Sequence, residues 1–296
     1  MDPQQYGLKS IDFSSGETAD TSRFTRRNFI VTTLASGFAL AASPVMAQAI
    51  KTDSKGLVAD AVSIPVADGK IPGYRAMPDK AGSFPTVVVI QEIFGVHEHI
   101  QDVCRRLAKL GYYAIAPELF ARQGDVSKMT DIGAILTDVV TKVPDAQVMS
   151  DIDAALAFAK ASKHADTARL GVIGFCYGGR ATWLYAAHNP AVKAGVAYYG
   201  LLEGLKSDIK PNDPVDIGAT LKVPVLGLYA ELDAYIKADA VDRMTKQLVA
   251  SGSGSQIVIF PGVDHGFNAD YRPTYDKAAA TYGWKLARDW LKEHGV

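Results

Sequence analysis

The sequence predicts an α/β protein whose central sheet is mostly parallel and is covered by helices on both faces. Two observations lead to this prediction. Short apolar runs of strand length, such as the β-branched run 86–90, alternate with amphipathic helical patterns along most of the chain. The part of the chain after residue 50, about 245 residues, also suits one α/β domain, and 48% of all residues are hydrophobic, enough for a large core.

Each element is expected from its own pattern. Apolar runs predict strands at 86–90, 112–116, 170–173, 194–199, 223–229 and 256–260. Apolar residues at helical spacing predict helices at 99–110, 145–163, 178–188, 237–250 and 273–294. Residues 57–78 are expected to form an antiparallel hairpin ahead of the alternating part. No internal repeat or linker interrupts the chain, so we expect residues 51–296 to form a single domain.

The first 50 residues are expected to be an N-terminal tail and an export signal. Arg26 and Arg27 precede an uncharged stretch from Asn28 to Ile50, which ends in small residues. This order is typical of a signal peptide, with cleavage expected after Ala47 or, as a second option, after Ala49. The arginine pair is similar to the twin-arginine export signal. We therefore expect the twin-arginine machinery as a partner and a periplasmic or secreted location; a retained membrane anchor is the alternative.

Charge and cysteine usage exclude several classes of protein. The formal net charge of −1 argues against nucleic acid as a partner. Neither Cys104 nor Cys176 belongs to a CxxC pair or stands at metal-ligand spacing from a histidine. His97 and His99 are two positions apart near a helix start, so we expect them to face different directions. The sequence therefore predicts no metal and no cofactor.

One motif carries most of the functional argument. The sequence Gly174-x-Cys176-x-Gly178 stands between a predicted strand and a predicted helix. A nucleophile on a sharp strand-to-helix turn needs neighbours without side chains, so that strand and helix can approach. The position at a helix N-terminus favours a thiolate. The alternative interpretation is a buried, unreactive cysteine in a glycine-rich turn.

An acid and a histidine follow downstream in the order of the α/β-hydrolase fold. His265 follows the last predicted strand, where this fold places its general base. Asp233 follows the strand 223–229 and could orient the imidazole. Glu231 is a rival for that role, and Asp264 is expected to be a solvated loop residue.

With these residues in place, the chain resembles the dienelactone hydrolase (carboxymethylenebutenolidase) family over about residues 57–294. The resemblance rests on Gln-Glu-Ile-Phe-Gly at 91–95, Ala-Pro-Glu-Leu-Phe-Ala-Arg at 116–122, Gly-Phe-Cys-Tyr-Gly-Gly at 174–179, Asp233 and the His265 loop. It implies an α/β-hydrolase fold and hydrolysis of a small activated ester or enol-lactone. The implied mechanism uses a Cys-His-Asp triad and an acyl-thioester intermediate, without cofactor or metal.

The resemblance also implies roles for residues outside the triad. Glu92 would contact the resting thiol and help to generate the thiolate, and the backbone N–H groups of Ile93 and Tyr177 would form the oxyanion hole. Arg122 matches a family arginine that binds a substrate carboxylate. Arg272 is displaced from the place of a second family arginine, and Asp270 adds a negative charge nearby. This departure leaves the substrate open.

Two other functions stay open at this stage. One is a thiol redox or peroxide-scavenging protein that uses Cys176, with Cys104 as the resolving cysteine. The other is a binding protein that has kept the fold without catalysis. We expect a monomer. Four aromatic residues could either line a pocket or belong to the core: Trp183, Tyr198, Tyr199 and Tyr235.

Overall fold

The computed structural model describes residues 50–296. The expected export signal and both of its cleavage options therefore lie outside the described residues. Within 50–296, none of the helices combines the length and the apolar character needed to cross a bilayer.

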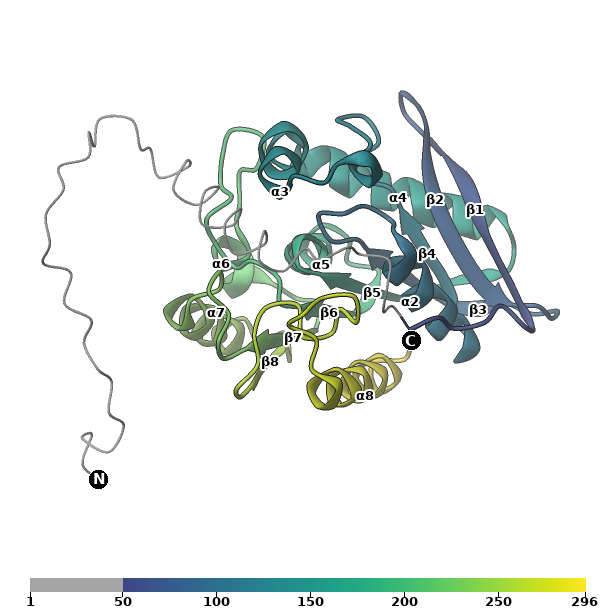
Figure 1. The fold of residues 1–296 in the computed structure, drawn as a ribbon. Helices are drawn as coiled ribbons and strands as arrows, with labels where there is room; N and C mark the ends of the chain where they lie inside the picture. Colours follow the sequence, from purple (N-terminus) through teal and green to yellow (C-terminus); the bar gives the residue numbers. More distant parts are fainter. Residues whose placement is uncertain (1–49) are drawn as a thin grey trace, which may run out of the picture.

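An eight-stranded sheet runs through the centre of the molecule (Figure 1). Its spatial order is β1-β2-β4-β3-β5-β6-β7-β8. The hairpin β1-β2 is antiparallel and adds to β4 in the antiparallel sense, whereas all pairs from β4 to β8 are parallel. The strands are β1 (Leu57–Val66), β2 (Gly69–Pro78), β3 (Phe84–Ile90), β4 (Tyr113–Pro117), β5 (Ala165–Phe175), β6 (Val192–Tyr198), β7 (Val225–Ala230) and β8 (Gln256–Phe260).

Helices cover both faces of the sheet (Figure 1). The long ones are α2 (Glu98–Lys109), α4 (Asp145–Ala161), α5 (Tyr177–His188), α7 (Ala238–Ser251) and α8 (Lys277–Glu293). Two glycines of β5 show the two layers: a Cβ at Gly171 would meet Leu291 of α8, and one at Gly174 would meet Thr182 of α5. Positions three apart on a strand point to opposite faces, so α5 and α8 lie on opposite sides.

The predicted α/β architecture is confirmed, and the differences lie at element ends. The hairpin, the six later strands and the five long helices are all present. Strand β5 begins at Ala165 rather than at Leu170. Helix α8 begins at Lys277 rather than at Pro273, because the Asp276 side chain accepts a hydrogen bond from the Ala279 amide at 2.8 Å and caps the helix there.

The sequence patterns did not predict the short helical segments. These are α3 (Ile132–Ala134), α6 (Pro214–Ile217) and the single turns Val126–Lys128, Ile135–Val139, Val140–Lys142 and Gly218–Thr220. Each is too short to show a helical period in the sequence.

Candidate active site

The turn between β5 and α5 presents Cys176 with a strained backbone. Its φ is +53°, in the left-handed region that few non-glycine residues adopt. A Cβ at Gly174 would lie 2.0 Å from the Gly178 carbonyl oxygen, and one at Gly178 would lie 2.2 Å from the Ile90 carbonyl oxygen. Both glycines are therefore required by backbone contact, in agreement with the steric reason inferred from the motif.

Hydrogen bonds on both sides hold this turn in place. The Cys176 amide donates to the Tyr198 carbonyl at 3.0 Å, which ties the turn to the end of β6. Arg180, one helical turn later, makes a bidentate ion pair with Asp145 at 2.8 and 2.9 Å, which fixes α5 to the start of α4. The thiol is nearly enclosed, since Cys176 is 4% exposed.

His265 and Asp233, which follow Cys176 in the sequence, contact each other in the structure. His265 Nδ1 lies 2.7 Å from Asp233 Oδ2. The other carboxylate oxygen of Asp233 accepts hydrogen bonds from the amides of Tyr235 at 2.9 Å and Ile236 at 3.2 Å, so the acid is fixed by its own loop. This arrangement places the proton on Nδ1 and leaves Nε2 as the acceptor for a thiol proton.

The imidazole has an unusually high proton affinity. Burial disfavours the charged ring, but the Asp233 carboxylate, together with the Cys176 side chain beside it, raises the pKa of His265 to about 10. Two tyrosine rings pack against it, with centroids 5.1 Å away for both Tyr199 and Tyr235. The protonated imidazolium is the charge state of His265 that this environment favours.

The rival acid does not reach the imidazole. Glu231 is exposed, and its carboxylate accepts a hydrogen bond from the Gly262 amide at 2.8 Å. Asp264 caps the amide of His265 at 2.6 Å within the same turn. Of the acids considered from the sequence, Asp233 is the one that contacts the imidazole in this structure.

Glu92, directly after β3, is fully buried among donors. Tyr271 donates its hydroxyl proton to one carboxylate oxygen, and Arg272 Nη2 donates to the other at 3.1 Å. His97 Nε2 lies 3.6 Å from the carboxylate. Burial alone would raise the pKa of Glu92, yet Arg272 and the neighbouring histidines hold the pKa far below its usual range. The carboxylate therefore stays ionised, and these donors are the partners that the structure gives it.

Arg272 is enclosed rather than solvent-facing. Its guanidinium lies 5.3 Å from the Phe94 ring centroid and 5.5 Å from that of Tyr271. Burial would lower the pKa of Arg272, but Tyr271, Glu92 and Cys176 raise it above its ordinary value. Arg272 therefore reaches the site even though its position in the sequence differs from that of the family arginine.

The negative charge of Asp270 is compensated locally. Its carboxylate lies 3.0 Å from His99 Nδ1 and accepts hydrogen bonds from Arg106 Nη2 at 2.7 Å and from the Ile50 amide at 3.3 Å. Burial would raise the pKa of Asp270, but His99 and Arg106 lower it. The Asp270 carboxylate, which is next to Arg272 in the sequence, thus pairs with His99 and Arg106 of α2 instead.

The predicted orientation of two histidines is wrong. The rings of His97 and His99 are stacked, with centroids 6.1 Å apart and planes 21° from parallel, and both pack against Tyr271. Helical periodicity does not apply to the pair because His97 precedes α2 with extended backbone angles, φ −77° and ψ 179°. Within residues 50–296, no group of three or more potential ligands is arranged to hold a metal ion.

Arg122 lies between two acids. Its guanidinium binds Asp68, in the turn of the β1-β2 hairpin, at 2.7 Å and Asp151 of α4 at 2.7 Å. These acids and the hydrogen bonds they accept raise the pKa of Arg122 above its ordinary value. Each carboxylate occupies one side of the guanidinium group. The expected role of Arg122 toward a substrate carboxylate therefore stays a prediction.

The expected oxyanion-hole backbone lies beside the thiol. Tyr177 is the first residue of α5, so its N–H is one of the helix donors without an intrahelical partner. Gly178 packs onto the carbonyl groups of Ile90 and Gln91, which brings the loop carrying Ile93 against the start of α5. The two backbone segments needed for the hole are therefore adjacent.

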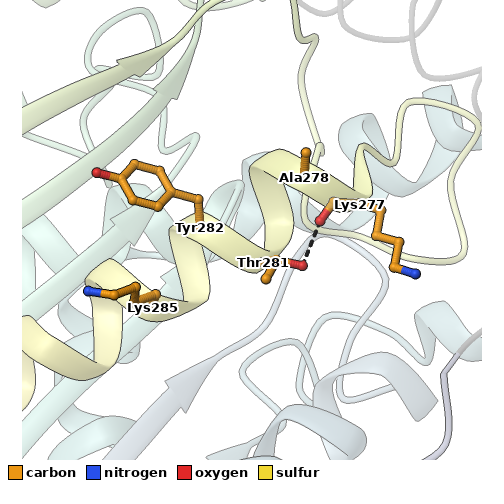
Figure 2. Close-up of a pocket in the computed structure, with 5 residues that line it drawn as sticks. All are labelled: Lys277, Ala278, Thr281, Tyr282 and Lys285. Atoms are coloured by element: carbon orange, nitrogen blue, oxygen red, sulfur yellow. Dashed lines mark hydrogen bonds between the residues drawn. The ribbon is translucent and has the colours of Figure 1, made fainter.

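A surface hollow elsewhere does not match this chemistry. Figure 2 shows it along one helix, α8, lined by Lys277, Ala278, Thr281, Tyr282 and Lys285. The Thr281 hydroxyl donates to the Lys277 carbonyl at 2.7 Å, an ordinary intrahelical bond. The hollow contains no acid, histidine or cysteine, so the site around Cys176 is the candidate active site.

Sequence reasoning did not assign Tyr271 and His97 to the site. Both are recognised by their contacts with Glu92. Neither falls in a motif quoted above, and their positions depend on loops that meet in space. The one signal in the sequence was the placement of Tyr271 beside Arg272.

Comparisons with known proteins identify the family of this chain. Residues 71–295 match the model of the dienelactone hydrolase family. A candidate carboxymethylenebutenolidase of Methylorubrum extorquens is 58% identical over 98% of this chain and 100% of its own length, and one of Escherichia coli K12 is 48% identical over 90% and 98%. The crystal structure of a candidate dienelactone hydrolase from Klebsiella pneumoniae superposes with a TM-score of 0.78, at 50% identity over 80% of this chain and 99% of that one. The chain therefore belongs to the dienelactone hydrolase family.

Proposed function

We propose that this protein hydrolyses a small activated ester or enol-lactone by thiol catalysis at Cys176. The single observation that carries the proposal is the continuous contact from the Cys176 thiol through His265 to Asp233, with 2.7 Å between imidazole and carboxylate. Family membership supports hydrolysis of a lactone or ester bond, since relatives are named for carboxymethylenebutenolide cleavage.

The proposed first half-reaction uses the high proton affinity of His265. The imidazole takes the thiol proton, and the Cys176 thiolate attacks the substrate carbonyl carbon. The carbonyl oxygen becomes an oxyanion that accepts hydrogen bonds from the backbone N–H groups of Ile93 and Tyr177. When the bond to the leaving oxygen breaks, the imidazolium returns its proton to that oxygen, and an acyl-thioester remains on Cys176.

The second half-reaction reverses these roles with water. His265 takes a proton from water, the hydroxide attacks the thioester carbonyl, and the carboxylic acid leaves as the thiolate is restored. A thiolate is a weaker base than an alkoxide, so a thiol enzyme favours substrates with good leaving groups. This preference supports enol-lactones and activated esters over amides as the substrate class.

Glu92 and Arg272 form an ion pair that we assign to the substrate end of the site. Tyr271 and Arg272 hold the Glu92 carboxylate, and Arg272 is also close enough to influence Cys176. A substrate carboxylate that bound Arg272 would compete with Glu92 and release it toward the thiol. Arg122 stays a second candidate for binding the substrate carboxylate. In the free protein it is paired with two acids, which a substrate would have to displace.

The test is hydrolysis of p-nitrophenyl acetate and of a dienelactone by residues 48–296, beside the variant Cys176→Ala. We expect turnover that falls by at least about 10³-fold in the variant. Cys104→Ala is the matched control and should retain the activity. Equal activity of Cys176→Ala and the parent protein would contradict the thiol mechanism, and an absence of turnover in all three would contradict the proposed function.

Export by the twin-arginine route is a separate proposal that rests on Arg26 and Arg27. It is tested by fractionating cells that express the full chain. We expect the protein in the periplasmic or secreted fraction, and we expect replacement of both arginines by lysine to keep it in the cytoplasm. Unchanged distribution of that variant would overturn the proposal.

A further inference from the structure

Tyr199 combines a buried hydroxyl that has no hydrogen-bond partner with a strained backbone. The residue follows β6, is fully buried, and has a φ of +37°. Its hydroxyl oxygen has no hydrogen-bond partner anywhere in residues 50–296. A buried hydroxyl left without a partner costs about 1–3 kcal/mol, and a non-glycine residue at positive φ adds strain. Both costs fall on one residue.

The backbone around Tyr199 is held from two sides. Its amide donates to the Leu228 carbonyl of β7 at 2.8 Å. The next residue, Gly200, packs so closely on α5 that a Cβ there would lie 2.3 Å from the Gly179 carbonyl carbon. The chain therefore cannot relax by rotating Tyr199 away, and one of its two contacts is with α5, the helix that begins directly after Cys176.

The surroundings of the Tyr199 side chain are those of the reacting groups. Its ring centroid lies 5.1 Å from that of His265 and 5.4 Å from that of Phe267. Burial, then the charge of Glu92, raises the pKa of Tyr199 well above its ordinary value, with Arg272 opposing and Cys176 adding to the rise. The hydroxyl is therefore protonated at any working pH. It can donate a hydrogen bond, and it is close enough to Cys176 for the two groups to influence each other.

We propose that the Tyr199 hydroxyl donates a hydrogen bond to an oxygen of the reacting ester or lactone group when the substrate is at Cys176. Bound substrate would supply the acceptor that the hydroxyl lacks in the free protein. A donor aimed at an oxygen that gains negative charge on attack stabilises the transition state more than the ground state. This inference rests on the proposed thiol hydrolase and adds a substrate-contacting residue to it.

The neighbouring Tyr198 is a natural control. It is also fully buried, and its hydroxyl also has no hydrogen-bond partner within the described part of the chain. Its ring, however, stacks on Phe175 at 4.9 Å and lies under α8, where its Cε1 would be 3.3 Å from a Cβ at Gly283. Tyr198→Phe and Tyr199→Phe each remove one buried, unpartnered hydroxyl, and they differ in what the ring packs against, since only the Tyr199 ring packs on His265.

The kinetic experiment compares these two variants on p-nitrophenyl acetate. We expect Tyr199→Phe to lower kcat by about 10- to 100-fold with KM within about twofold. Tyr198→Phe should stay within about twofold of the parent in both constants. Thermal unfolding should show that neither variant is less stable than the parent, because each loses an unsatisfied hydroxyl. Equal kcat values for the two variants would overturn the proposal.

A second measurement separates failure of this inference from failure of the proposed function. Butyraldehyde adds reversibly to a thiol: the sulfur bonds to the carbonyl carbon and the thiol proton moves to the oxygen. We titrate butyraldehyde and measure protection of Cys176 from iodoacetamide, which needs no turnover. Tyr199→Phe should weaken protection about tenfold and Tyr198→Phe should not. If the parent protein hydrolyses no ester, the proposed function fails, and equal protection in both variants would by itself overturn the role of Tyr199.

Discussion

The two cysteines of this chain are equally enclosed and differ in almost everything else. Cys104 is 0% exposed and Cys176 is 4% exposed, and both are free thiols. Cys104 lies within the regular helix α2, where burial raises the pKa of its thiol far above the usual range. Cys176 lies on a strained turn at a helix start and contacts His265. Burial alone therefore does not decide thiol chemistry; the group that faces the sulfur decides it.

The largest effect is expected when the carboxylate that orients the His265 imidazole is removed. Asp233→Asn should lower kcat by about 10³–10⁴-fold, because the amide would stabilise the wrong tautomer of His265. Steady-state hydrolysis of an activated ester measures the effect, with Glu231→Gln as the control. If the control lost as much activity as Asp233→Asn, the acid would have been assigned to the wrong residue.

Alkylation tests the same contrast without a substrate. Native protein treated with iodoacetamide at pH 7 should take up one equivalent at Cys176, more than about 100-fold faster than at Cys104. Peptide mass mapping over time follows both thiols, and unfolded protein should label both at similar rates. Comparable native rates would contradict the contrast and would support the redox interpretation in which Cys104 acts as a partner thiol.

The raised pKa of His265 predicts how stability changes with pH. The folded value of about 10 lies above an unfolded value of about 6.5, so the stabilisation is complete below pH 6.5 and is lost as the pH rises toward 10. The free energy of unfolding should fall by up to about 1.4 kcal/mol per pH unit across that window. Urea denaturation at several pH values measures it. Asp233→Asn should flatten the profile; parallel profiles for the two proteins would contradict the assignment.

The smallest effect is expected at the inert thiol. Cys104→Ala removes one buried sulfur from the packing of α2 and should cost about 1–2 kcal/mol of unfolding free energy. Activity should stay within about twofold of the parent. Thermal melts and ester hydrolysis check both statements, and a loss of activity without loss of stability would assign Cys104 a function that its surroundings do not suggest.

The sequence was sufficient where function and structure are local. The sharp turn between β5 and α5 could be predicted because five consecutive residues contain Cys176 and both glycines, and backbone contacts of 2.0 and 2.2 Å explain the glycines. The contact between Asp233 and His265 could be expected because each lies on the loop after a strand that periodicity identifies, β7 and β8. The parallel sheet followed from the alternation of strands and helices, and the structure confirms it.

The rest of the site depends on contacts between distant segments. Tyr271 reaches Glu92 across 179 positions of the chain, and Arg122 reaches Asp68 across 54. No period or local motif encodes such pairs. The stacking of His97 on His99 was mispredicted for a related reason: the helix that was expected to separate them begins one residue after His97.

The two glycines that flank Cys176 affect how this protein can change by mutation. Gly174 and Gly178 touch backbone atoms, which no substitution elsewhere can move aside cheaply, so the position of Cys176 is fixed by the scaffold. The half-buried Phe94 and Tyr235 stand instead on loops at the ends of β3 and β7. Because these two rings pack on Arg272 and His265, we expect changes of substrate range to come from loop side chains while the turn at Cys176 stays constant, and a mutant library for this enzyme belongs at those loops.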